Sequence, residues 1–168
     1  MCTRLYAYAQ ISKPYPRQSL DYIDDGCYKD LLNDMGFMFA IRQVLRVHEG
    51  GLAYFGMPCN SFGFMSKSLH GRTPKSPWGR LCFVFVQQGN ILGARMCLLL
   101  ALCVARGIRF MVENPDRSAI GFFPYLAHIM SFPDLKPERV FWWGPQNLYL
   151  QKKHVRHVRL ISIACTMC

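Results

Sequence analysis

The sequence predicts a single α/β domain with a doubly wound, Rossmann-like parallel sheet. The chain has 168 residues, of which 51% are hydrophobic, and this suits one domain with a sizeable core. Helix patterns and short apolar strand patterns alternate along its middle, which is typical of a parallel sheet with crossover helices. In such sheets ligands bind beyond the carboxyl ends of the strands, so residues that follow a strand are the first candidates for a site.

The first half of the domain contains three of these elements. Residues 20–24, "LDYID", are a candidate strand. Residues 31–47 form a helix, because apolar residues recur there at helical spacing: Leu31, Met35, Met38, Ile41 and Leu45. The pair Gly50 and Gly51 follows that helix as a stop signal, and the strand 52–57 comes next.

The second half begins with a polar segment, 59–78, that we expect to be a long loop. Four further elements follow from apolar patterning and from their stop and cap residues. In chain order they are a helix over 90–106, a strand over 108–114, a helix over 118–129, and late strands in "RVFWW" (139–143) and "VRLISI" (158–163).

These patterns predict three segments. Residues 1–19, which contain the proline-rich "SKPYPRQ", are expected to be an irregular lead-in. Residues 20–150 form the α/β domain, and residues 151–168 form a divergent basic tail.

Charge indicates a polyanionic partner. The chain carries 20 Lys plus Arg against 10 Asp plus Glu, a formal net charge of +10. Nucleic acid is the commonest such partner, and acidic membrane surfaces or acidic proteins are the alternatives. We expect nucleic acid, DNA rather than RNA, and no membrane, because the most apolar run, 96–104, is far shorter than the roughly 20 residues of a membrane span.

Cysteine usage predicts a reducing intracellular compartment, the nucleus or the cytoplasm. Three of the eight cysteines, Cys82, Cys97 and Cys103, lie within apolar runs and are expected to be small core residues rather than disulfide partners. The first residues contain no apolar core of the length that a targeting segment needs. No histidine lies at a spacing that implies a zinc site, so no metal is expected.

Two short motifs follow two of the predicted strands. "GMPCNSF" places Pro58 and Cys59 after the strand 52–57, and "FMVENP" places Glu113 and Asn114 at the end of the strand 108–114. If these strands are parallel neighbours, both motifs lie at the same rim. Together, and in this order, the motifs resemble the Pro-Cys and Glu-Asn motifs of DNA (cytosine-5) methyltransferases, over roughly residues 20–145.

The resemblance implies a covalent mechanism. Position 5 of cytosine is a weak nucleophile, and a thiolate that adds to position 6 activates it. A protonated carboxyl at nitrogen 3 lowers the barrier to that addition. By resemblance Cys59 is the nucleophile, Glu113 the acid, Pro58 the residue that sets the loop, and Asn114 the residue that braces it.

The resemblance also implies S-adenosylmethionine as methyl donor and a base flipped out of the duplex. Acids near the ends of earlier strands are the candidates for the cofactor site: Asp24, Asp25 and Asp30. Basic residues of the 59–78 loop are the candidates for phosphate binding: Lys67, Arg72 and Lys75.

Two features depart from the family. No glycine-rich turn is visible before residue 20, and no Gln-x-Arg motif follows later, so we expect an incomplete or divergent member that lacks the first strand. A non-catalytic, basic nucleic-acid-binding module with the same fold is therefore the alternative. A cysteine hydrolase that pairs Cys59 with His70 or His128 as base is a third possibility.

Overall fold

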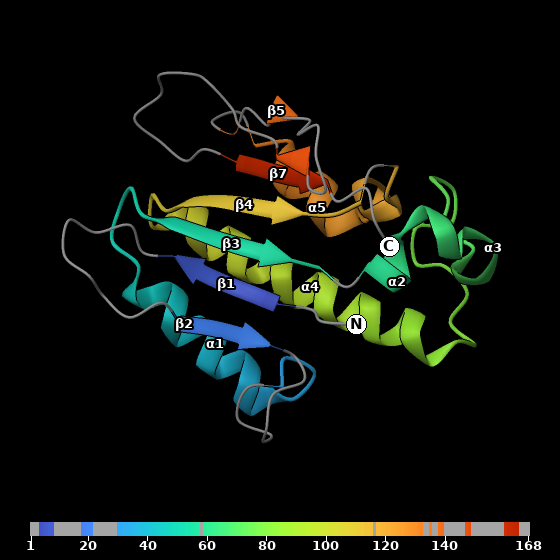
Figure 1. The fold of residues 1–168 in the computed structure, drawn as a ribbon, viewed down its shortest axis with the longest axis horizontal. Helices are drawn as coiled ribbons and strands as arrows, with labels where there is room; N and C mark the ends of the chain where they lie inside the picture. The colour runs from blue at the N-terminus through green and yellow to red at the C-terminus, as the bar shows by residue number, and fades with distance from the viewer. Residues whose placement is uncertain are drawn as a thin grey trace.

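The structure is a computed structural model (Figure 1). It describes residues 30–57, 59–115, 117–132 and 135, with Cys59 described by its backbone alone. It also describes the backbone of five short strand segments: 4–8, 18–21, 138–139, 147–148 and 160–164.

In this part of the chain the strands form one seven-stranded sheet in the order β2-β1-β3-β4-β7-β5, with β6 paired to β7. The strands β3, β4, β7 and β5 run parallel to their neighbours in that order, whereas β1 is antiparallel to both β2 and β3. Their bounds are β1 Arg4–Tyr8, β2 Gln18–Asp21, β3 Leu52–Gly56, β4 Arg109–Glu113, β5 Glu138–Arg139, β6 Asn147–Leu148 and β7 Leu160–Ala164.

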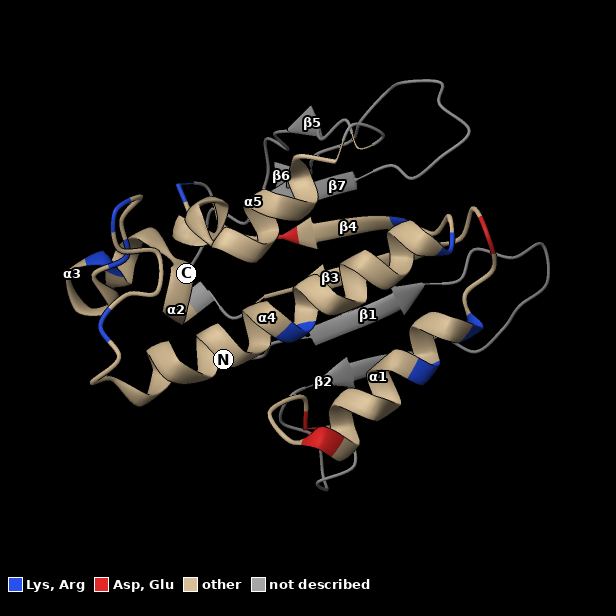
Figure 2. Ribbon diagram, turned by 180° about the vertical axis from the view of Figure 1, so that it is seen from behind, with Lys and Arg blue, Asp and Glu red and all other residues tan. Residues whose placement is uncertain are grey.

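The three longest described helices lie on one face of the sheet, as the two opposite views show (Figures 1 and 2). They are α1 Asp34–Arg46, α4 Val84–Ala105 and α5 Pro124–Met130. The mixed α/β class and the parallel β3–β4 pair therefore agree with the sequence prediction. A doubly wound sheet carries helices on both faces, and the described helices do not show that arrangement.

Local side chains explain where α1 begins. The Asp30 carboxylate accepts a hydrogen bond from the Leu32 amide at 2.8 Å, and the Asn33 side chain accepts one from the Gly36 amide at 2.7 Å. Asn33 is thus the N-cap, and the helix begins at Asp34 rather than at residue 31. On α4, Arg95 donates to the Asn33 carbonyl at 2.6 Å, which ties the two helices together.

The core lies between the sheet and α4. Phe55 of β3 and Phe110 of β4 point into it, and strand alternation places Met111 on the opposite face. The helix α4 contributes a buried stripe: Leu92, Met96, Cys97, Leu99, Leu100 and Cys103. It ends before Gly107, whose φ of 64° is the left-handed conformation that glycine favours.

One helix of the described residues, α4, is long and apolar enough to cross a membrane. Core helices of globular proteins satisfy the same criterion, and α4 packs one side against the sheet. This feature is therefore weak evidence for a membrane, and the expected absence of a membrane partner stays a prediction.

Several elements differ from those expected. The strand β1 falls within the 1–19 segment that was predicted to be irregular. Leu5 and Ala7 alternate with more polar neighbours, which indicates a strand. The prediction gave more weight to the proline-rich stretch that follows, and so treated the whole segment as irregular. The strand β7 confirms the late strand expected over 158–163, but it pairs with β4 and so belongs to the sheet rather than to a separate tail.

The polar segment 59–78 is not a continuous loop. It contains α2 Cys59–Phe62, η1 Phe64–Ser66 and α3 Lys67–His70. The helix expected over 118–129 is divided into η2 Ala119–Phe122 and α5, because Pro124 restarts the helix at its first position. Among the cysteines, Cys97 and Cys103 are buried as expected, but Cys82 is exposed because it precedes α4 in a turn.

Candidate active site at the carboxyl ends of β3 and β4

The two motifs meet at one rim of the sheet. The strands β3 and β4 are parallel neighbours in which Gly56 pairs with Glu113, and the Met57 amide donates to the Glu113 carbonyl at 3.4 Å. The helix α2 begins at Cys59, directly after this point. Backbone positions 54 residues apart in the sequence thus lie at the same edge, as the sequence predicted. Pro58 lies outside the described residues.

Glu113 is the last residue of β4 and is half-buried at that edge. Burial raises the pKa of its carboxyl group above the ordinary value of 4.5, because removal from water disfavours the charged form. The protonated carboxyl is the form that can donate a hydrogen bond to a ring nitrogen.

Asn114 connects the end of β4 to α2. Its side chain is 5% exposed and is hydrogen-bonded to the Ser118 hydroxyl, which also lies 3.1 Å from the Phe62 carbonyl. The Ser118 oxygen accepts from the Ile120 amide and so caps η2. Among the described residues the amide nitrogen of Asn114 has no hydrogen-bond partner. A buried polar group without a partner is costly, which makes this position a candidate for a ligand contact.

Arg72 is buried at the base of the segment that follows Cys59. Its side chain is 1% exposed, and its guanidinium lies 4.0 Å above the Phe62 ring. Its five N–H groups have five acceptors: the Ser61 carbonyl and hydroxyl at 2.7 Å each, the Pro77 carbonyl at 2.8 Å, the Asn90 side chain at 2.7 Å and the Val86 carbonyl at 3.3 Å. It therefore holds α2 against the beginning of α4.

The prediction that Arg72 binds phosphate is therefore wrong. Its donors are all engaged within the protein, and burial lowers its pKa to about 10 because removal from water disfavours the charged form. The other two predicted phosphate ligands, Lys67 and Lys75, are exposed and stay available for that role.

His70 is also engaged. Its Nε2 lies 3.1 Å from the Gly63 carbonyl, and its Nδ1 accepts a hydrogen bond from the Arg72 amide at 2.9 Å. Burial lowers the pKa of the ring, so the neutral form with a proton on Nε2 fits both contacts. Neither nitrogen is free to act as a base for Cys59. Of the two histidines that the hydrolase hypothesis named, only His128 is left as a candidate base. His128 is exposed on α5, where its ring contacts Phe132 at 5.3 Å.

Only one predicted cofactor residue can be placed. Asp24 and Asp25 lie outside the described residues, and Asp30 stands in the turn before α1. One Asp30 carboxylate oxygen is used by the Leu32 amide. Asp30 therefore has one oxygen left for a ligand, and its main observed role is to shape the turn.

Sequence reasoning missed two of the side chains that hold this rim together, Ser61 and Asn90. One signal was available in Gly89, which lies inside α4. A Cβ atom there would lie 2.0 Å from the Ser61 hydroxyl, so only glycine lets α2 pack this closely on the helix. The polar partners of Arg72 are 5 to 18 positions away along the chain, and no local pattern indicates them.

Comparison of the chain with protein-family models, with curated proteins and with solved structures found no match.

Proposed function

We propose that this chain transfers a methyl group to position 5 of cytosine in DNA, with Cys59 as the nucleophile and Glu113 as the acid. One observation supports the proposal: Glu113 is the last residue of β4, and Cys59 begins the helix that follows β3, the parallel neighbour in which Gly56 pairs with Glu113. The finer fold assignment, a methyltransferase type of sheet, belongs to the same proposal.

The residues at the rim suit this chemistry. The Cys59 sulfur would form a bond to carbon 6 of the ring while nitrogen 3 receives a proton from Glu113. The raised pKa of Glu113 supports this role, because more of the carboxyl group keeps its proton near neutral pH. S-adenosylmethionine, when bound, supplies the methyl group. Loss of the proton from carbon 5, release of the thiolate and return of the nitrogen 3 proton to Glu113 then restore the ring.

Asn114 supports the same proposal as a bracing residue. Through Ser118 it links the strand that carries Glu113 to the helix that begins with Cys59. Such a link keeps the two groups at a fixed separation, and catalysis depends on fixed geometry.

A second candidate function is a non-catalytic, nucleic-acid-binding module. Two observations favour it. Asp30 uses a carboxylate oxygen to hold the turn before α1, and α1, α4 and α5 cover one face of the sheet only. This function keeps the basic surface and dispenses with the methyl donor.

Calorimetry of S-adenosylmethionine binding to the purified chain at low salt separates the two. Methyl transfer requires one stoichiometric site, and Asp30→Asn should weaken it if Asp30 faces the cofactor. The exposed Asp34→Asn is the matched control and should leave the affinity unchanged. Absence of measurable binding would rule out methyl transfer by this chain and leave the binding module.

A further inference from the structure

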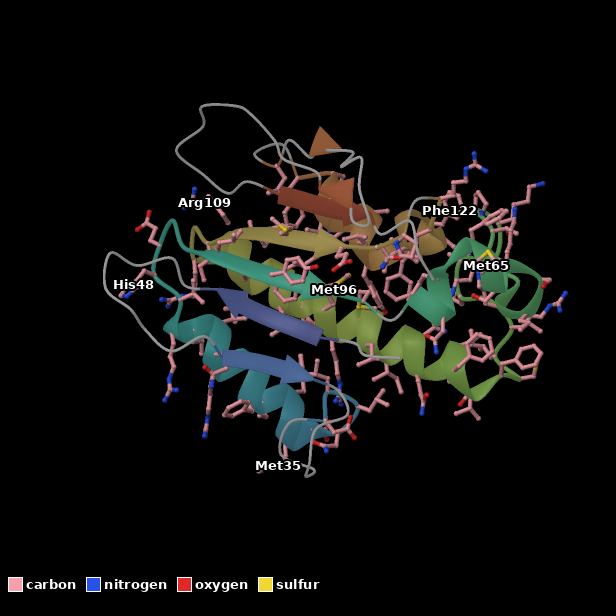
Figure 3. All side chains as sticks on the ribbon, viewed as in Figure 1. Met35, His48, Met65, Met96, Arg109 and Phe122 are labelled. Carbon is pink, nitrogen blue, oxygen red and sulfur yellow. The ribbon has the colours of Figure 1, made fainter. Side chains whose placement is uncertain are left out.

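Aromatic side chains are exposed at the end of the molecule that contains α2, α3 and η2. Phe64 is 51% exposed, Trp78 is 39% exposed and Tyr125 is 50% exposed. Figure 3 shows Met65 and Phe122, two further exposed apolar residues, at this same end. Exposed aromatic residues that gather in one region often mark a binding surface.

Two of these rings form a rigid pair. The ring centroids of Trp78 and Tyr125 lie 5.5 Å apart, and both rings contact Phe123, at 5.2 and 5.7 Å. Phe123 is fully buried and contacts Phe62 at 5.7 Å. The planes of the two exposed rings are 75° apart and both rings rest on a buried ring, so little freedom would be lost when a flat ligand stacks on either one.

A third ring carries a cation. The Arg117 guanidinium lies 6.0 Å from the centroid of Phe64. Arg117 has a φ of 60°, which is the left-handed conformation that side chains other than glycine rarely adopt. The chain thus holds an exposed arginine beside an exposed phenyl ring in a strained backbone conformation, and strain of this kind gathers at functional sites.

Positive charge predominates in the sequence interval that supplies Phe64 and Trp78. No Asp or Glu occurs between Glu49 and Glu113, an interval that includes α2, α3 and all of α4. Lys67 and Lys75 are exposed within it. Figure 2 shows basic segments at α3 and in the loop that follows it. This interval attracts anions because it contains basic residues and no carboxylate that would repel them.

We propose that these residues form a binding surface for single-stranded nucleic acid, here called the rim surface: Phe64, Trp78, Tyr125, Lys67, Lys75 and Arg117. Unpaired bases expose flat faces that stack on aromatic rings, while lysine and arginine bind the backbone phosphates. The inference deepens the proposed function, on which it rests, by naming the form of nucleic acid. It explains how a strand would lie beside Cys59, because Phe64 follows that residue by five positions.

The arrangement favours a single strand over the other polyanions. In a duplex the base faces are stacked on one another and cannot reach Trp78 or Tyr125. A protein that binds a membrane surface presents a continuous apolar face with cations at its edge. Here Lys67 comes directly after η1, between the exposed Met65 and Leu69, so cations and apolar groups are interleaved.

Fluorescence anisotropy with a labelled thymidine-only oligonucleotide tests the rim surface without any cytosine for Cys59 to attack. The single strand should bind at least about tenfold more tightly than its duplex with an adenine-only strand. Trp78→Ala and Tyr125→Ala should each weaken it about tenfold, and Trp78→Phe should restore most of the loss. Leu98→Ala, at an exposed apolar residue of α4, is the control and should bind normally.

The charges are tested with two double variants that lower the net charge by the same amount. Lys67→Gln with Lys75→Gln should reduce the dependence of log affinity on log salt by about 1.4, since each single-strand phosphate contact contributes about 0.7. Arg42→Gln with Arg46→Gln removes two exposed charges from α1 and should leave that slope unchanged.

Equal binding of duplex and single strand, equal effects of the two charge pairs, or binding only to phosphatidylserine vesicles would overturn the proposal. Each result can be read even if S-adenosylmethionine does not bind, so failure of the rim surface and failure of methyl transfer are distinguishable. Circular dichroism shows whether Trp78→Ala folds, and the lysine pair tests the surface if that variant does not.

Discussion

Glu113 shows how one residue at a strand end differs from its neighbours. Its carboxyl group is half-buried, and its pKa is raised by burial. Strand alternation takes its side chain away from the core that Phe110 and Val112 enter, and the carboxyl ends of β3 and β4 leave it at the rim. A carboxyl group that keeps its proton can act there as a catalytic acid. Its ionisation lowers the free energy of unfolding, because the charged form is partly removed from water.

The raised pKa of Glu113 predicts how the stability of the protein depends on pH. Because the folded pKa lies above the unfolded one, the stabilisation is complete below about pH 4.5 and is lost as pH rises through the folded pKa. Glu113→Gln cannot ionise, so its stability relative to the original chain should increase between about pH 4 and about pH 8. Urea denaturation at both pH values measures this. Glu49→Gln, at an exposed carboxylate, is the control, and an equal increase there would contradict the prediction.

The sequence predicted the position of the two motifs correctly but the role of Arg72 wrongly. The Pro-Cys and Glu-Asn motifs indicated the correct rim because each directly follows an apolar strand pattern, and strand ends are well marked by glycine and proline. Arg72 was misread because a buried arginine and an exposed one look the same in sequence. Its burial depends on acceptors such as Ser61, Pro77 and Asn90, which only the folded chain brings together.

At the scale of elements, Arg72 fixes the short helices α2 and α3 to the first turns of α4. The guanidinium reaches α2 through Ser61 and α4 through Val86 and Asn90. The segment would otherwise be a polar loop, as its sequence suggested. The position of Cys59 at the start of α2 therefore depends on a residue of the loop that follows α3.

This dependence predicts a large loss of stability for Arg72→Met. The substitution leaves several buried carbonyl and hydroxyl oxygens without a donor, and we expect a loss of about 3 kcal/mol in the free energy of unfolding. Lys75→Met, in the same loop but exposed, should change it by less than about 0.5 kcal/mol. Urea denaturation gives both values. Trypsin should also cleave after Lys67, a site that both variants keep, faster in the Arg72 variant than in the original chain. Similar unfolding and cleavage of the Arg72 and Lys75 variants would show that the guanidinium does not hold this segment.

Element boundaries followed the sequence where the local signals were strong. The strands β3 and β4 and the helix α1 were predicted to within a few residues, because glycine, asparagine and apolar spacing define them locally. The helix α4 begins six residues earlier than expected, since Phe83 has no side-chain capping contact that would mark the start. The strand β1 was missed because it is antiparallel and short, and its pairing to β3 joins residues over 40 positions apart.

In the whole molecule, the sheet determines where the strand-end motifs and the rim surface lie. Its parallel strands β3 and β4 end at one edge (Figures 1 and 2). The acid-free interval between Glu49 and Glu113 supplies four of the six residues of the rim surface, and Arg117 and Tyr125 follow it. Net charge predicted a polyanionic partner but not where it would bind. The aromatic pairs that would contact it are formed by residues as far apart as Trp78 and Tyr125, and only the fold joins them.

Covalent trapping is the sharpest test of whether Cys59 is a nucleophile toward cytosine. An oligonucleotide that contains 5-fluorocytosine should form a denaturation-resistant adduct in the presence of S-adenosylmethionine, because fluorine replaces the proton at carbon 5 whose loss releases the thiolate. Mass spectrometry should locate the adduct at Cys59. Cys59→Ser should abolish it, and Cys82→Ser, which replaces an exposed cysteine outside the rim, should leave it intact. An adduct that survives Cys59→Ser, or no adduct on the original chain, would contradict the claim.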